Sequence, residues 1–160
     1  MDRTPVVRSD SMRALGVDYG RKRVGLALSD ASGMLARPWK TLAVAGIDRQ
    51  AGELARAVEA LAAESDGLSV IVIGLPRRLS GEANEQTAAV EQLAARLGRH
   101  TAVPIVLQDE RLTSHEAEEL LSRREKDWRK RKSQLDAVAA ALILQDYLDA
   151  RPRLTFEPEP

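Results

Sequence analysis

One uninterrupted apolar segment near the middle of the chain does most to restrict its fold. The segment reads LSVIVIGLP, from Leu68 to Pro76, and is rich in β-branched residues before Gly74. A strand with one face in water alternates apolar and polar residues, whereas a continuous apolar run needs cover on both faces. The segment therefore predicts a central strand in a sheet that carries helices on both sides.

The first part of the chain predicts a β-hairpin. In ALGVDYGRKRVGLALSD, apolar residues alternate with small or polar ones over residues 13–18 and again over 23–29. Between them lie Gly20, Arg21 and Lys22, which suit a turn. Two antiparallel strands are therefore expected here.

Strand and helix signals alternate through the remainder of the chain. We expect a weaker strand over 39–44, helices over 48–63 and 83–97, a short strand over 103–110, a helix from Thr113 and a last helix over 133–148. Strand–helix–strand units cross over right-handed and make their strands parallel. The order predicts an α/β fold with a mixed five-stranded sheet, three antiparallel strands and then two parallel ones, flanked by helices.

Length and composition predict one cytoplasmic domain. A chain of 160 residues can bury one sizeable core, which we place at residues 12–150. Residues 1–11 are expected to be a flexible leader, with Met12 as an alternative start, and the proline-rich residues 151–160 a disordered tail. The absence of cysteine excludes disulfides and thiolate chemistry. No apolar run is long enough to span a bilayer, so no membrane partner is expected.

Asp18 is an acidic residue in an otherwise apolar strand. A buried carboxylate without a partner costs several kcal/mol, so a hydrogen bond, an ion pair or a bound cation is expected. Its strand and the strand ending at Asp109 and Glu110 should finish at the same sheet edge, where ligands bind in α/β folds. Because strand residues alternate between faces, only one of these two acids shares the face of Asp18. The longer Glu110 is expected to reach across Gly74.

A third acid, Asp136, is expected in the first turn of the last helix. Ala137 and the alanines at 139–141 follow it, and such small residues let a helix lie close to a sheet. Three converging carboxylates repel one another unless a cation intervenes, and oxygen ligands suit hard divalent ions. Asp18, Glu110 and Asp136 therefore form a candidate catalytic metal site for Mg²⁺ or Mn²⁺, with two ions expected alongside substrate.

Four segments of the chain resemble the YqgF/RuvX family of RNase H-like nucleases. They are VDYGRKRVGLALSD, VIGLPRRLSGEANEQ, LQDERLTSHEAE and LDAVAAALILQDYL, and with their surroundings they cover about residues 12–148. The resemblance implies that the family's acidic positions correspond to Asp18, Glu110 and Asp136. It also implies a metal-dependent nuclease for structured nucleic acid, acting on the 5′ end of pre-16S rRNA or, alternatively, on Holliday junctions.

Two departures from the family pattern concern the substrate rather than the metal. Ser80 and Gly81 stand where the family often has Asp-Gly, so an acid expected near that loop is missing. The connector before the last helix is unusually basic.

The basic connector gives the chain a marked charge asymmetry despite its zero net charge. RREKDWRKRK, residues 123–132, holds seven basic and two acidic residues. Such a run is either a solvated surface or a phosphate-binding one in which Trp128 stacks on a base. The expected substrate-binding residues are Arg21, Lys22, Arg77, Arg78, Arg111, Trp128, Arg129, Lys130, Arg131 and Lys132.

Each acid also has a structural alternative. Asp18 could cap the turn at Gly20, Glu110 could pair with Arg111 or Arg77, and Asp136 could form a capping box with Ser133. A nucleic-acid-binding scaffold without catalysis also fits the charge pattern. An ATP-handling module of the sugar-kinase type would need a second domain. RNA and branched DNA both remain possible substrates, and either a monomer or a weak homodimer is expected, since symmetric junction cutting needs two sites.

Overall fold

The protein is described by a computed structural model that covers residues 11–76, 85–110 and 128–151. The leader before residue 11, the tail beyond residue 151 and the helix expected from Thr113 lie outside these ranges. The elements in chain order are β1 (Ala14–Tyr19), β2 (Val24–Ser29), β3 (Ala36–Leu42), α1 (Ile47–Ala63), β4 (Val70–Pro76), α2 (Glu85–Gly98), β5 (Ile105–Glu110) and α4 (Trp128–Ala150). No helix within the described ranges has the length and apolar character that crossing a membrane requires.

The five strands form one mixed sheet in the order β3-β2-β1-β4-β5. β1 pairs antiparallel with β2, and β2 pairs antiparallel with β3. β4 is parallel to both β1 and β5, because each crossover carries a helix. The predicted sheet, with three antiparallel and then two parallel strands, is confirmed.

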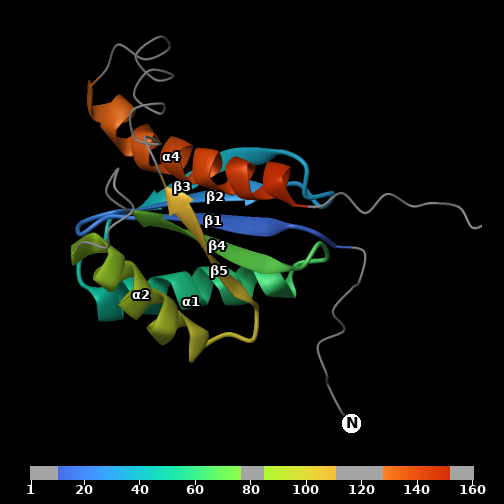
Figure 1. Ribbon diagram of the computed structural model, residues 1–160, viewed down its shortest axis with the longest axis horizontal. Helices are drawn as coiled ribbons and strands as arrows, with labels where there is room; N and C mark the ends of the chain where they lie inside the picture. The colour runs from blue at the N-terminus through green and yellow to red at the C-terminus, as the bar shows by residue number, and fades with distance from the viewer. Residues whose placement is uncertain (1–10, 77–84, 111–127, 152–160) are drawn as a thin grey trace, which may run out of the picture.

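Helices cover both faces of the sheet. α4 lies on one face, and α1 and α2 lie on the other (Figure 1). Ile71 and Ile73 of β4 pack in the core beneath α1 and α2, while Val70 and Val72 pack in the core beneath α4. The unbroken apolar run that predicted this strand thus supplies side chains to two cores.

Two element boundaries differ from the prediction by three residues or more. β3 begins at Ala36 instead of residue 39, since its exposed residues at 37–40 carry no apolar alternation. It is an edge strand, where Pro38 is tolerated because one side of the strand needs no ladder bonds.

The start of α4 is a second correction. The helix begins at Trp128 instead of residue 133, so the last part of the basic run is helical. Arg and Lys are good helix formers, and apolar spacing alone could not reveal a helix that extends beyond its buried part. The prediction that Asp136 lies in the first turn is wrong, and so is its capping box with Ser133.

α4 approaches the β1–β2 pair closely because two glycines leave room for it. A Cβ atom on Gly25 would overlap the carbonyl group of Asp136. A Cβ atom on Gly16 would lie 2.7 Å from Cβ of Leu144 and 2.8 Å from the carbonyl oxygen of Ala140. These two positions fix how closely α4 can lie on the sheet.

We predict that Gly25→Ala destabilises the protein by about 3 kcal/mol or more, because α4 must shift to make room for the added Cβ atom. Overpacking usually costs about 1–3 kcal/mol. Gly52→Ala is the matched control: Gly52 is inside α1, and an added Cβ meets nothing within 4 Å. That substitution should stabilise by about 0.5–1 kcal/mol through helix propensity. Urea unfolding of both variants measures the difference. Equal stability of the Gly25 variant and wild type would contradict the close approach.

Candidate active site

Asp18 and Asp136 lie on the same face of the sheet. Asp18 pairs with Gly25 across β1 and β2, so their Cβ directions share a face. That face is the one covered by α4, because a Cβ on Gly25 would meet the backbone of Asp136. Two acids that are 118 positions apart in the sequence are thus both neighbours of Gly25.

The strand register separates Glu110 from Asp109. β4 lies between β1 and β5, and Gly74 pairs with Gln108. Val106 packs against the core beneath α4, whereas Ile105 packs against the core beneath α1 and α2. By alternation Glu110 occupies a position on the face of Asp18, and Asp109 occupies one on the opposite face. The side chain of Glu110 lies outside the described part of the chain.

Arg23 is paired with one of the proposed metal ligands. Its Nε atom donates a hydrogen bond of 2.8 Å to Oδ2 of Asp136, and the two side chains are 38% and 22% exposed. Arg23 is not among the site residues predicted from the sequence. The signal was its alternation: Arg23 directly precedes β2 and lies two residues before Gly25, so it continues the face of Gly25.

The donor set present is compatible with a hard divalent ion. Carboxylate oxygens of Asp18 and Asp136 share a face with the strand position of Glu110, and such ions prefer oxygen ligands. Within the described part of the chain, no three acidic or histidine side chains gather as a metal cluster. The described donors are therefore two carboxylates, one of them bonded to a guanidinium.

A hollow of about 790 Å³ opens beside Asp136. It is lined by Tyr19, Gly20, Arg21, Lys22, Arg23, Ala45, Gly46, Ile47, Gln86 and Asp136. Arg21 and Lys22 are exposed, and the hollow also borders the first residue of α1, where the helix dipole is positive. Among the described residues that line it, every charged side chain except Asp136 is cationic, which suits an anionic ligand.

Gln50 of α1 holds the turn between β1 and β2 in place through hydrogen bonds. It is fully buried in α1, and its Nε2 atom donates to the carbonyl oxygens of Gly20 at 2.8 Å and Val44 at 3.0 Å. Sequence reasoning missed this residue as well. The available signal was a glutamine at the start of the apolar stripe that continues with Leu54 and Val58.

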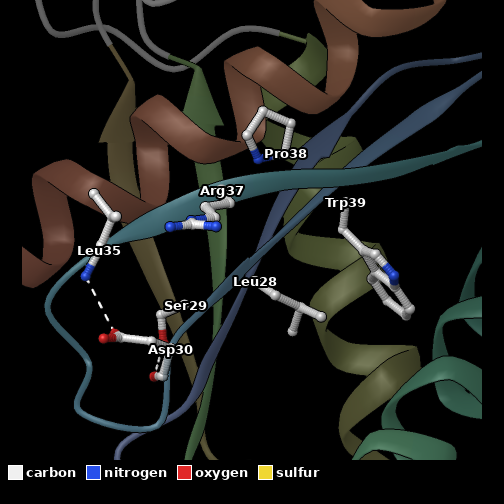
Figure 2. Close-up of a pocket in the computed structure, with 7 residues that line it drawn as sticks. All are labelled: Leu28, Ser29, Asp30, Leu35, Arg37, Pro38 and Trp39. Atoms are coloured by element: carbon white, nitrogen blue, oxygen red, sulfur yellow. Dashed lines mark hydrogen bonds between the residues drawn. The ribbon is translucent and has the colours of Figure 1, made fainter.

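A second hollow, of about 470 Å³, lies at the other end of β2 and β3 (Figure 2). Asp30 points into it, but its carboxylate accepts bonds from Ser32, Met34 and Leu35. The Ser32 hydroxyl contributes most to lowering the pKa of Asp30, and the backbone N–H groups add to it. This acid orders the loop that follows β2.

The remaining predicted substrate contacts are only partly placed. Arg77, Arg78 and Arg111 lie outside the described residues, as does Ser80. Trp128, Arg129, Lys130, Arg131 and Lys132 belong to the first turns of α4, ahead of Asp136 on the same helix.

Comparison with known proteins decides the family. The profile described as "RuvX: Holliday junction resolvase" matches residues 12–150. The chain belongs to the RuvX family. A relative from Syntrophus aciditrophicus named "Putative pre-16S rRNA nuclease" is 42% identical over 139 residues, covering 87% of this chain and 89% of the relative. A relative of the same name from Geobacillus kaustophilus is 36% identical over 140 residues, covering 88% and 99%.

Solved structures agree with the fold of this RuvX chain. T. thermophilus RuvC in complex with a Holliday junction substrate matches with a TM-score of 0.51 at 18% identity, covering 88% of this chain and 95% of that one. The RNase H-like fold implied by the sequence resemblance is therefore confirmed. The predicted family and its class, nucleases that hydrolyse phosphodiester bonds, are confirmed by the family match and the named relatives.

We predict that Gln50→Leu destabilises this RuvX protein by about 1–3 kcal/mol, because the partly buried carbonyl groups of Gly20 and Val44 lose their donor while the side-chain volume is nearly kept. Gln92→Leu is the control, since Gln92 is exposed on α2 and contacts only Arg96, at 3.5 Å, among the described partners. It should change stability by less than about 0.5 kcal/mol. Thermal unfolding distinguishes the two. A Gln50 variant as stable as the Gln92 variant would refute the role of the amide.

Proposed function

We propose that this RuvX chain is a divalent-metal-dependent nuclease that processes the 5′ end of pre-16S rRNA. The observation that carries the proposal is that two acidic residues are neighbours of Gly25 on β2. Asp18 of β1 is its strand partner, and the backbone of Asp136 on α4 lies against it. The names of the curated relatives support rRNA as the substrate.

In this proposal Asp18, Glu110 and Asp136 bind the ions. Asp18 lies on β1, between β2 and the β5 position of Glu110, so it would hold both ions, while Glu110 and Asp136 would each hold one. Bound Mg²⁺ or Mn²⁺ would supply a nucleophilic water and stabilise the leaving oxygen. The carboxylates orient this chemistry from two strands and one helix, elements that cannot shift without disturbing the sheet.

Cations of the chain hold the substrate. Arg21 and Lys22 line the hollow beside the acids and neutralise phosphates there. We assign the same role to Arg77, Arg78 and Arg111, which follow β4 and β5 at the same sheet edge. Trp128 and the basic residues 129–132 begin the helix that carries Asp136, so a strand entering the site passes along α4.

Holliday junction cleavage is the second candidate, favoured by the description of the family that matches residues 12–150. A symmetric junction is cut by two sites related by a two-fold axis, so this function requires a dimer. Incubating purified protein with four-way junction DNA and with a pre-rRNA fragment, each with Mn²⁺ and with chelator, distinguishes the two substrates. Sedimentation of the same samples reports the oligomeric state. Preferential cutting of junction DNA by a dimer would replace our first proposal.

Asp18→Asn is predicted to keep the fold and to lower the rate of Mn²⁺-dependent cleavage by about 100-fold or more. Even substitution of residues that only hydrogen-bond to metal ligands lowers metal affinity or activity by about 10–100-fold. Glu110→Gln should lose activity similarly. The matched control is Asp109→Asn, one residue away on the opposite face and exposed, which should cleave at the wild-type rate. The measurement is the initial rate on a labelled pre-rRNA fragment. Full activity of the Asp18 variant, or equal losses at positions 109 and 110, would overturn the assignment.

A further inference from the structure

The ion pair between Arg23 and Asp136 lies within the proposed metal site. We propose that Arg23 is a resident counter-ion, which pairs with Asp136 while the site is free of divalent ions and moves to a substrate phosphate once ions bind. This inference rests on the proposed function. Its starting observation is the 2.8 Å bond from Nε of Arg23 to Oδ2 of Asp136.

The acidic site needs a positive charge before any ion arrives. Asp18 and Asp136 are both neighbours of Gly25, and the Asp136 side chain is only 22% exposed. Like charges at partly buried positions repel more strongly than in water. Arg23 offsets this repulsion, because its guanidinium places a positive charge against Asp136.

The same guanidinium opposes the binding of divalent ions. It already occupies Oδ2 of Asp136, so an ion at this carboxylate either displaces it or is bound next to a full positive charge. Repulsion between a doubly and a singly charged cation is large at such separations. Arg23 therefore weakens the affinity of the empty site for ions.

The side chain of Arg23 also borders a second region in which it can bind an anion. Its side chain is 38% exposed and borders the same hollow as Arg21 and Lys22, the cationic region where we place substrate phosphates. A guanidinium binds phosphate through two parallel hydrogen bonds. A substrate phosphate would thus attract Arg23 away from Asp136 and add negative charge for the ions. Ions and nucleic acid should consequently strengthen each other's binding.

A purely structural role for Arg23 predicts the opposite change in the affinity for divalent ions when Arg23 is replaced. If Arg23 only held the Asp136 side chain in a ligating orientation, its loss would weaken ion binding. Because the two roles change the affinity in opposite directions, one titration separates them.

The test is Mn²⁺ binding to the full chain, followed by electron paramagnetic resonance of the free ion without nucleic acid. Arg23→Gln is expected to lower the Mn²⁺ Kd about tenfold, or about 1.4 kcal/mol. Arg23→Lys keeps the charge and should stay near the wild-type value. Arg21→Gln is the matched control: it removes the same charge from the same turn and should change the Kd less than about twofold, since exposed charges are strongly screened.

A second measurement follows substrate affinity. Fluorescence anisotropy of a labelled pre-rRNA fragment, in Ca²⁺ and in chelator, should show that ions strengthen binding to wild type more than to Arg23→Gln. An equal effect of ions on the two proteins would overturn the exchange of partners.

The outcomes separate this inference from the proposed function. If Asp18→Asn binds Mn²⁺ as well as wild type, or wild type binds none, both fail. If Mn²⁺ binding depends on Asp18 but Arg23→Gln binds equally or more weakly, the proposed function stands and the counter-ion role of Arg23 is wrong. Circular dichroism of each variant establishes that the fold is kept.

Discussion

The close approach of α4 to the first two strands is the constraint on which the site depends. At positions 16 and 25 the sheet carries glycine and no side chain, so Ala140 and Leu144 pack closely over β1 and the backbone of Asp136 reaches β2. Because Gly25 is also the strand partner of Asp18, the same close contact makes two acidic residues neighbours of one glycine. Packing and chemistry are therefore set by the same residues.

Electrostatics then determines what this arrangement can do. Acidic residues near the carboxyl ends of parallel strands destabilise the fold when no positive charge is close to them. The β1–β2 hairpin supplies such charges. Arg23 pairs with Asp136, and Arg21 and Lys22 border the adjoining hollow. Gln50 fixes the turn that carries these cations, because its Nε2 atom donates a hydrogen bond to the carbonyl oxygen of Gly20. The hairpin turn is thus as much a part of the site as the acids.

Strand alternation made most of the fold predictable from sequence, and also the sheet faces of positions 18 and 110. Period-two patterns gave the hairpin around Asp18, and the register agrees with choosing Glu110 over Asp109. Polar residues at inward positions were harder, because a charge such as Arg23 in a turn is usually solvated. The first turns of α4 were missed since residues 128–132 carry no apolar spacing. How closely α4 lies on the sheet is a tertiary property that only the fold reveals.

The most direct test of the account is where a paramagnetic ion binds. Substoichiometric Mn²⁺ added to the ¹⁵N-labelled protein broadens amide resonances only near the ion. The account predicts that Asp18, Gly25 and Asp136 broaden first and together, although they lie on two strands and a helix. Broadening centred instead on Asp30, whose loop lies at the far end of β2, or spread evenly over the surface acids, would contradict the convergence of carboxylates at Gly25.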